Sequence, residues 1–215
     1  FGEKYKKAIS CIVSRKPDLK ENCVAILINY KGNYQQSKIE LDIESCKKSK
    51  VALVIDNKPH KELPTIVVKE PLKLILQRLA KIVKEKYNPI TVAITGSVGK
   101  TTIKDMLSEV FDINYKTLHI EGNNNTIFTI SQTLQKLERD DEAYIQEIHG
   151  GEIGSASNCS KLIEPNIALI SNIGTAHISQ VGSIEELIKA KLQIIDGLQK
   201  DGVLIINNDN EFLKE

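Results

Sequence analysis

The sequence contains no tryptophan, and aromatic residues make up only 5% of it. Few aromatic rings leave little surface on which nucleic-acid bases could stack. The net charge of +1 gives no electrostatic attraction to a polyanion. We therefore expect no nucleic-acid partner. No apolar run approaches the length of about 20 residues that a membrane-spanning helix requires, so we expect no membrane insertion.

Cysteine is also scarce, and its spacing excludes two common structural roles. The sequence contains no CxxC pair, and its four cysteines are scattered, at Cys11, Cys23, Cys46 and Cys159. A zinc site or a disulfide framework is therefore not expected, and reduced thiols favour a cytoplasmic protein. The chain begins at Phe1 with no signal peptide, which is typical of a fragment. We expect a monomer or a weak oligomer.

Hydrophobic residues make up 41% of the sequence, which predicts a packed core. Three short apolar, β-branched runs predict strands at 22–30, 51–56 and 65–70, with a helix at 39–48 between the first two. A further helix begins near Pro71 and ends at Asn88, because the residue before a proline avoids helical geometry. We therefore predict a first, small α/β domain at residues 1–88.

The second part of the chain, residues 89–215, alternates strands with helices. Apolar runs predict strands at 90–94, 143–148, 166–171 and 202–207, and helices from Thr101 onward and at 127–137 and 183–198. This alternation predicts an α/β domain with a mainly parallel sheet. Helical spacing predicts that the first helix faces the core with one stripe, formed by Ile103, Met106, Leu107, Val110 and Phe111.

The segment ITGSVGKTT, residues 94–102, joins the first of these strands to the helix after it. Its end matches the phosphate-binding pattern G-x-x-x-x-G-K-[ST], but Ile94 occupies the position of the first glycine. Such a loop needs converging backbone N–H groups, a lysine and a hydroxyl for Mg²⁺, at the N-terminus of a helix. The alternative is a plain strand–turn–helix corner. We predict that phosphate is bound by Thr95, Gly96, Ser97, Val98, Gly99, Lys100, Thr101 and Thr102.

Lys191 is unusual because it falls on the apolar side of a predicted helix. Ser183 and Glu186 form a capping-box pattern that defines the start of this helix. Lys191 shares a stripe with five apolar residues, whereas Lys189 points away from it; the five are Ile184, Leu187, Ile188, Ile195 and Leu198. A lysine in this position either extends its amine to solvent or has a buried partner.

The form TGSVGKTT after an apolar strand resembles the Mur ligase family, ATP-dependent ligases that join an amino acid or peptide to a carboxylate. The segment GNNNTIFTISQTL is similar to the family's asparagine-rich loop near the ATP phosphates, which makes Asn123 and Asn125 candidates for nucleotide binding. SNIGTAHISQVGS resembles the family segment that carries a histidine near a metal, which implies a role for His177. A structural histidine is the alternative.

The resemblance also implies a magnesium site. Glu147 lies near the carboxyl end of a predicted strand, where ligands of α/β sheets gather, and Mg²⁺ prefers hard oxygen ligands. The alternative is a charge that points to solvent. In the family, the lysine of a similar A-K-x-x-I segment is carbamylated, which implies a carbamate on Lys191 that coordinates Mg²⁺. The implied metal-binding residues are Thr101, Glu147, His177 and Lys191.

The implied activity is ATP-dependent formation of an amide bond through an acyl phosphate. Its implied catalytic residues are Lys100, Glu147, His177 and Lys191. The first domain resembles the one that binds the UDP part of the acceptor, so the expected partners are ATP and a carboxylate acceptor such as a UDP-linked cell-wall precursor. GSVGKTT and AHISQVGS are nearest to the branch that adds D-alanyl-D-alanine in peptidoglycan synthesis.

The resemblance covers nearly the whole chain, but it implies an incomplete middle domain and lacks the family's third domain. We therefore expect this chain alone to bind nucleotide without forming an amide bond. Two alternatives stay open on the sequence. One is a P-loop kinase or nucleotide-dependent switch, and the other is a non-catalytic scaffold with the ligase fold.

Overall fold

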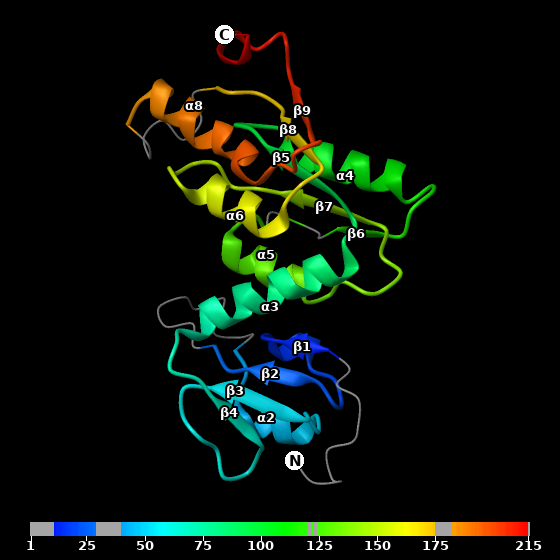
Figure 1. The fold of residues 1–215 in the computed structure, drawn as a ribbon, viewed down its shortest axis with the longest axis vertical. Coiled ribbons are helices and arrows are strands. Elements are labelled where there is room, and N and C mark those ends of the chain that lie inside the picture. The colour runs from blue at the N-terminus through cyan, green and yellow to red at the C-terminus, as the bar shows by residue number, and fades with distance from the viewer. Residues whose placement is uncertain (1–10, 29–39, 120–121, 123, 175–181, 215) are drawn as a thin grey trace. The chain divides into compact units, whose positions relative to one another are not determined.

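The structure, a computed structural model, describes residues 11–28, 40–119, 122, 124–174 and 182–214. The chain divides into two compact units, Phe1–Ala80 and Lys81–Glu215. This division falls inside the long helix α3 (Leu72–Tyr87). Each unit is built on its own parallel sheet, which confirms the predicted α/β fold class (Figure 1).

The first unit contains a four-stranded sheet with the order β1-β2-β3-β4, in which every pair is parallel. Its strands are β1 (Ile12–Val13), β2 (Val24–Ile26), β3 (Leu53–Asp56) and β4 (Thr65–Val67). Asp42 caps helix α2 (Ile43–Lys48) by accepting a 2.7 Å hydrogen bond from the backbone N–H of Ser45. This hydrogen bond, with the Ser45 hydroxyl, lowers the pKa of Asp42 to about 2. Cys23 and Cys46 are free thiols buried in the core of this unit.

The second unit contains a five-stranded parallel sheet with the order β6-β7-β5-β8-β9 (Figure 1). Its strands are β5 (Ile90–Thr95), β6 (Thr117–His119), β7 (Ala143–Glu147), β8 (Ile167–Ile170) and β9 (Val203–Ile206). Strand β5 pairs with β7 on one side and with β8 on the other. The carboxyl ends of β5, β7 and β8 therefore lie at the same edge of the sheet, where the predicted phosphate loop begins at the end of β5.

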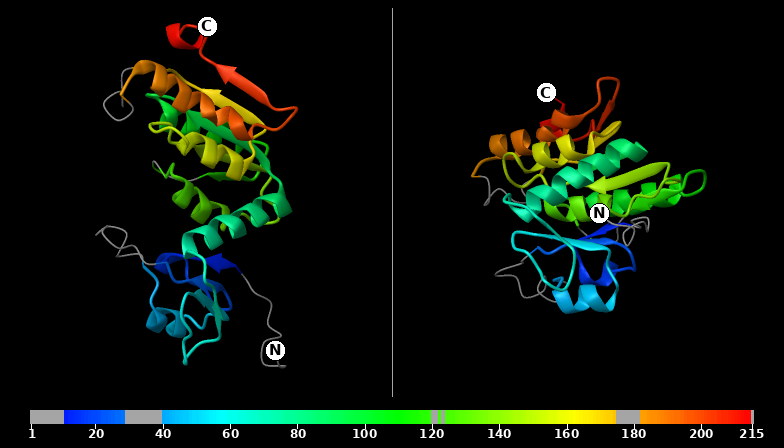
Figure 2. Two further views of the ribbon diagram at one scale, coloured as in Figure 1. Left: turned by 60° about the vertical axis from the view of Figure 1, so that its left-hand side comes forward. Right: turned by 60° about the horizontal axis from the view of Figure 1, so that its bottom comes forward.

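Helices cover both faces of this second sheet. Helix α4 (Lys100–Phe111) packs on β5 and β7. Helices α5 (Ile127–Leu134), α6 (Ser155–Ile163) and α8 (Ile184–Leu192) pack against one another in order and form the layer on the other face (Figures 1 and 2). The sequence analysis missed α6 because its small polar residues, SASNCSKLI, hide the helical period.

The prediction for the buried face of α4 was partly wrong. Ile103, Leu107 and Phe111 do pack on the sheet core. Met106 and Val110, however, are 63% and 59% exposed. The helix is rotated so that the centre of its buried face carries Lys104 and Ser108 instead, each 2% exposed. Apolar spacing missed this rotation because two polar residues take part in the packing.

The helix predicted at 183–198 ends early, at Leu192. The chain continues as a 3₁₀ segment, Gln193–Gly197, which has about 3.0 residues per turn instead of 3.6. The tighter winding buries Ile194 and leaves Ile195 43% exposed, which reverses the prediction for Ile195. The start of the helix is as predicted, because the Ser183 hydroxyl accepts a hydrogen bond from the Glu186 N–H.

Strand β9 is the last strand of the sheet as described, and all four of its apolar side chains are at least 40% exposed. The exposed fractions are 54% for Val203, 40% for Leu204, 46% for Ile205 and 40% for Ile206. Since neighbouring residues in a strand point to opposite faces, β9 is open on both faces. None of the described helices combines the length and the apolar character that crossing a membrane demands.

Replacement of Gly197 by alanine should lower the stability of the second unit. An added Cβ would lie 2.2 Å from the carbonyl carbon and oxygen of Ser160, and backbone cannot move aside as a side chain can. We expect Gly197→Ala to lower the free energy of unfolding by about 2–3 kcal/mol, measured by urea denaturation.

Gly154→Ala is the control, because a Cβ there meets nothing within 4 Å and only its φ of +86° is unfavourable. That variant should lose only about 1 kcal/mol. Equal losses for the two variants would contradict the steric explanation.

Candidate functional site

The predicted phosphate loop lies between β5 and α4, the position that anion binding requires. Ile94, which occupies the place of the expected first glycine, is fully buried and pairs with Glu147 on one side and Leu169 on the other. The strand therefore continues through this position, and the loop begins only at Gly96. Gly96 has a φ of +152°, and a Cβ on it would lie 1.9 Å from Ser171 Oγ. Glycine is thus required two residues later than the common pattern places it.

The segment that follows β8 holds the phosphate loop in place. The Asn172 side chain accepts a hydrogen bond from Val98 N and donates one to Val98 O, both at 3.1 Å. Ser171 Oγ donates to the same carbonyl at 2.8 Å. The backbone N–H of Ser97 donates to Asn172 O at 3.0 Å. The sequence analysis did not single out Ser171, the last residue of the strand predicted at 166–171, or Asn172, the residue after it.

Lys100, the first residue of α4, folds back over the loop. Its Nζ donates to the carbonyl oxygen of Gly96 at 2.9 Å and lies 3.5 Å from that of Ser97. Two carbonyl oxygens are weak partners for an ammonium group compared with the charged oxygens of a phosphate. The N-terminus of α4 adds its own partial positive charge at the same place. The loop therefore combines a cation, a helix dipole and backbone N–H groups within a few residues.

Glu147, at the carboxyl end of β7, is the centre of a side-chain cluster beside the loop. It is 2% exposed. Thr101 Oγ1 donates to one carboxylate oxygen at 2.7 Å, and Asn125 Nδ2 donates to the other at 2.8 Å. The structure thus brings together three residues that the sequence analysis singled out. It also distinguishes the two threonines, since Thr101 contacts Glu147 whereas Thr102 is exposed.

Several contacts anchor the asparagine-rich loop that carries Asn125. Gln146 Nε2 donates to Asn124 O, and His149 N donates to Asn125 O, each at 2.9 Å. The Lys104 ammonium lies 3.1 Å from Gly122 O and 3.0 Å from the Asp105 carboxylate. Thr126 caps α5 through a reciprocal pair of hydrogen bonds with Thr129. Lys104, which the sequence analysis did not single out, is a buried link between α4 and this loop.

Lys191 is 1% exposed, so of the two alternatives that the sequence left open its amine does not extend to solvent. Its Nζ donates to Gly150 O at 3.4 Å. Burial is the main cause that lowers the pKa of Lys191 to about 8, and the positive charge of Lys100 adds to it. Gly150 permits this close packing, because a Cβ there would lie 3.0 Å from Thr95 Oγ1 and 3.2 Å from Lys191 Cγ.

Thr95 and Ser97, two further residues predicted to bind phosphate, use their hydroxyls in contacts within the protein. Thr95 is fully buried and its hydroxyl donates to Ile148 O at 3.1 Å, while Ser97 Oγ contacts the backbone of Gly174. Both hydroxyls thus hold neighbouring chain segments. Asn123 and His177 lie outside the described residues.

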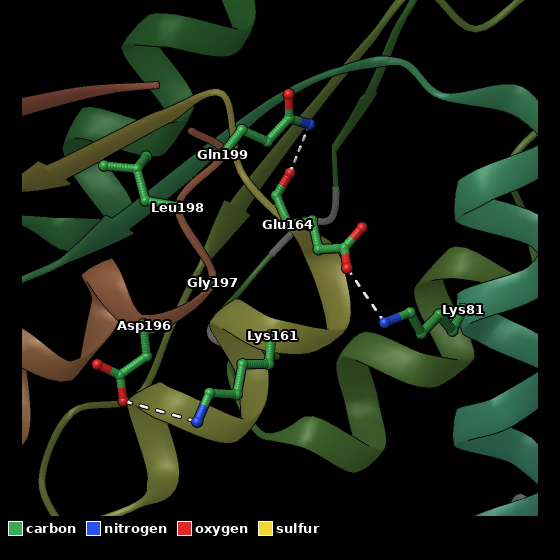
Figure 3. A pocket seen from close by; sticks show the side chains of 7 residues that line it. All are labelled: Lys81, Lys161, Glu164, Asp196, Gly197, Leu198 and Gln199. Carbon is green, nitrogen blue, oxygen red and sulfur yellow. Dashed lines mark hydrogen bonds and ion pairs between the residues drawn. The ribbon is translucent and has the colours of Figure 1, made fainter. Parts of the chain in front are cut away.

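A surface pocket lies near the amino ends of β8 and β9, at the edge of the sheet opposite the phosphate loop (Figure 3). Its charged side chains are already paired, Lys81 with Glu164 at 3.1 Å and Lys161 with Asp196 at 3.9 Å. The pocket is lined by Lys81, Lys161, Glu164, Asp196, Gly197, Leu198 and Gln199. Ligands of parallel α/β sheets gather at the carboxyl ends of the strands, so this pocket is not the nucleotide site.

The cluster around Glu147 fits the oxygen chemistry of Mg²⁺. A buried carboxylate and a hydroxyl are hard ligands, and Mg²⁺ keeps several waters and shares substrate phosphates in such sites. Among the described residues, Glu147 forms no ion pair with a lysine or arginine, so its negative charge is available to a cation. No group of three or more His, Cys, Asp or Glu side chains in the described part of the chain is arranged to hold a metal by itself.

Replacement of Thr101 by valine should destabilise the fold, because one oxygen of a buried carboxylate would lose its donor. We expect a loss of about 1–3 kcal/mol in the free energy of unfolding, measured by urea denaturation. Thr102→Val is the matched control, since Thr102 is exposed and its loss should stay within about 0.5 kcal/mol. A larger loss from Thr102→Val than from Thr101→Val would be incompatible with the Glu147 cluster.

Comparison with known proteins identifies a family for this arrangement. Residues 94–215 match the family described as the Mur ligase middle domain. The chain is 36% identical over 168 residues to the UDP-N-acetylmuramoyl-tripeptide–D-alanyl-D-alanine ligase of Haemophilus influenzae, a match that covers 76% of this chain and 36% of that protein. It is 36% identical over 139 residues to the ligase of the same name from Bacillus subtilis, covering 65% and 30%. The matches thus span about a third of these relatives.

Solved structures share the fold. A crystal structure of MurF from Acinetobacter baumannii superimposes with a TM-score of 0.83 at 23% identity and covers 97% of this chain and 45% of that one. MurF from Thermotoga maritima in complex with ADP gives a TM-score of 0.79 at 20% identity, covering 100% and 48%. With the match over residues 94–215, which is more than half of the sequence, these findings show that the chain belongs to the Mur ligase family.

Proposed function

We propose that this chain is the nucleotide-binding part of an ATP-dependent ligase that forms an amide bond between a carboxylate and an amine. The observation that supports this most directly is the Glu147 cluster. Thr101 and Asn125 hold a buried carboxylate beside a loop that also carries Lys100, so ligands for Mg²⁺ and for phosphate lie side by side. The relatives' names, all D-alanyl-D-alanine ligases, supply the proposed reaction class.

In the proposed reaction, a carboxylate oxygen of the acceptor attacks the γ-phosphorus of ATP, and the bond to the β-phosphate oxygen breaks to release ADP. The amine then attacks the carbonyl carbon of the acyl phosphate, loses a proton and expels inorganic phosphate. Lys100 would leave its carbonyl partners and neutralise charge on the transferred phosphoryl group. Thr101 and Glu147 would hold Mg²⁺, which spreads the charge of the phosphates.

Lys191 would take part as a carbamate. Its lowered pKa, about 8, leaves a fraction of the amine neutral near physiological pH, and only a neutral amine reacts with CO₂. The product would replace a buried cation by an anion with two oxygen ligands for Mg²⁺. It would also exchange repulsion from Lys100 for attraction, which favours the modified form. His177 is proposed both as a ligand of Mg²⁺ and as a catalytic residue, and Asn123 is proposed as a further nucleotide-binding residue.

The proposed acceptor is a UDP-linked peptidoglycan precursor and the proposed amine is D-alanyl-D-alanine, since these appear in the names of the relatives. The first domain, proposed at residues 1–88, would bind the acceptor, and residues 89–215 would bind ATP. Formation of an amide bond by the 215-residue chain alone would contradict the proposal that it supplies only the nucleotide-binding part.

Mg-ATP should bind this chain with a saturable calorimetric signal, and Lys100→Ala should weaken the affinity by about a hundredfold. The reason is that a lysine on phosphate makes charge-assisted hydrogen bonds worth about 1.5–3 kcal/mol. The titration should be done in bicarbonate-containing buffer, so that Lys191 can be modified.

Lys161→Ala is the control for this titration, because Lys161 is an exposed lysine at the opposite edge of the sheet. Its affinity should equal that of the unmodified chain. Equal affinity in the Lys100→Ala variant would exclude the phosphate loop as the binding site, and no binding in any variant would exclude nucleotide binding by this chain.

Labelled bicarbonate should give a carbamate signal in the carbon NMR spectrum that depends on Lys191. The signal should strengthen as the pH rises toward about 8 and fade below it, because the protonated amine cannot attack CO₂. Lys191→Met should remove the signal.

Lys84→Met is the matched control, since Lys84 is also buried, at 2% exposure, and burial also lowers its pKa. It lies on α3, and its Nζ is 3.5 Å from Asn88 Oδ1. The signal should persist in this variant. A signal that persists in Lys191→Met would overturn the assignment to Lys191.

A further inference from the structure

We propose that Asn172 is a positioning residue that sets the conformation of the phosphate loop for nucleotide binding. This inference rests on the proposed function, because it assigns to Asn172 a part in binding the phosphates of ATP. Asn172 itself would not contact the phosphates. It acts through Val98, the middle residue of the loop, and so supplies a constraint that the loop's own sequence lacks.

The contacts of Asn172 resemble the pairing between two strands. Its side-chain amide bonds both polar backbone atoms of Val98, accepting from N and donating to O at 3.1 Å each. Its own carbonyl oxygen accepts from Ser97 N at 3.0 Å. A side-chain amide has one acceptor and one donor group in a fixed plane, which is what a backbone N–H and C=O of one residue require. Asn172, two residues after the end of β8, therefore continues the β5–β8 pairing with both its carbonyl oxygen and its side-chain amide.

These bonds divide the N–H groups of the loop into two sets. Ser97 and Val98 donate theirs to Asn172, so these two N–H groups are already used within the protein. The next four N–H groups, from Gly99 to Thr102, begin α4, where helical geometry leaves the first N–H groups without a partner in the helix. Those groups are the ones that can converge on phosphate, together with Lys100. Fixing Val98 thus fixes the direction from which the chain enters the helix.

The constraint also accounts for the shifted glycine. Gly96 has no room for a Cβ because Ser171 Oγ occupies that space, and the same Ser171 Oγ donates to Val98 O at 2.8 Å. Ser171 and Asn172, which follow β8, therefore contact the loop both at Gly96 and at Val98. In the common pattern the first glycine stands two residues earlier, at the position of Ile94. Here the segment after β8 supports the loop and places the glycine at Gly96.

The test compares Asn172→Ala and Asn172→Asp with Asn166→Ala in this chain. Asn166 precedes β8 at the other end of the same strand, and it also uses both side-chain atoms: Thr91 N donates to its Oδ1 at 2.8 Å, and its Nδ2 donates to Gln199 Oε1 at 3.0 Å. It is thus a matched control for the loss of two hydrogen bonds. Two readouts are measured: amide hydrogen exchange at Val98, and the dissociation constant of Mg-ATP by calorimetry.

Asn172→Ala should speed exchange of the Val98 amide and weaken Mg-ATP binding, each by about tenfold, because two neutral hydrogen bonds to the loop are lost. Asn172→Asp keeps the acceptor for Val98 N–H, so exchange should stay slow. It loses the donor to Val98 O and adds a negative charge near the phosphates, so Mg-ATP binding should weaken by at least tenfold. Asn166→Ala should leave both readouts within about twofold of the unchanged chain.

Unchanged exchange at Val98 in Asn172→Ala would overturn the proposed contact. Faster exchange with unchanged Mg-ATP affinity would overturn the role in binding. Equal weakening by Asn166→Ala would show that loss of any two hydrogen bonds at β8 suffices, which also overturns it. If the unchanged chain does not bind Mg-ATP, the proposed function fails and the role in binding fails with it, while exchange at Val98 still decides whether Asn172 holds the loop.

Discussion

The close approach of Gly96 to Ser171 is the constraint on which the arrangement of the site depends. The two residues directly follow the neighbouring parallel strands β5 and β8, and a Cβ on Gly96 would lie 1.9 Å from Ser171 Oγ. This approach directs the chain from β5 into α4, which places Lys100 over the loop and Thr101 against Glu147. Strand β7, on the other side of β5, supplies Glu147 itself. The order β7-β5-β8 therefore matters as much as the loop sequence, because one neighbour supports the loop and the other carries the carboxylate.

Three charged side chains, Lys100, Lys191 and Glu147, surround the phosphate loop. Lys100 and Lys191 approach from α4 and α8, which cover opposite faces of the sheet, and their mutual repulsion contributes to the lowered pKa of Lys191. Glu147 lies at the edge between those faces with two neutral donors. In the unmodified chain, positive charge therefore exceeds negative charge among these three residues. An anion stabilises such an excess, and either a bound phosphate or the proposed carbamate on Lys191 would supply one.

Prediction from the sequence worked best where the spacing of apolar residues marked a strand or one face of a helix. The strands at β5, β7 and β8 were predictable because each is a short apolar run, and Lys191 was predictable because it interrupts an apolar stripe. Met106 and Val110 were misplaced because the rotation of α4 depends on Lys104 and Ser108, polar residues that bury themselves through tertiary contacts. Asn172 was missed for a related reason. Its partner is a backbone 74 residues away, and a backbone contact leaves no trace in the partner's side chain.

Strand β9 has a consequence for the behaviour of this chain in concentrated solution. Four consecutive apolar residues, VLII, are exposed on both faces of an edge strand that carries no charge of its own. Exposed edges of this composition act as templates for pairing with another chain, and proteins usually protect them with lysine, proline or a covering element. Within the described residues, β9 has none of these protections. We therefore expect the isolated chain to self-associate through β9, increasingly so as the protein concentration rises.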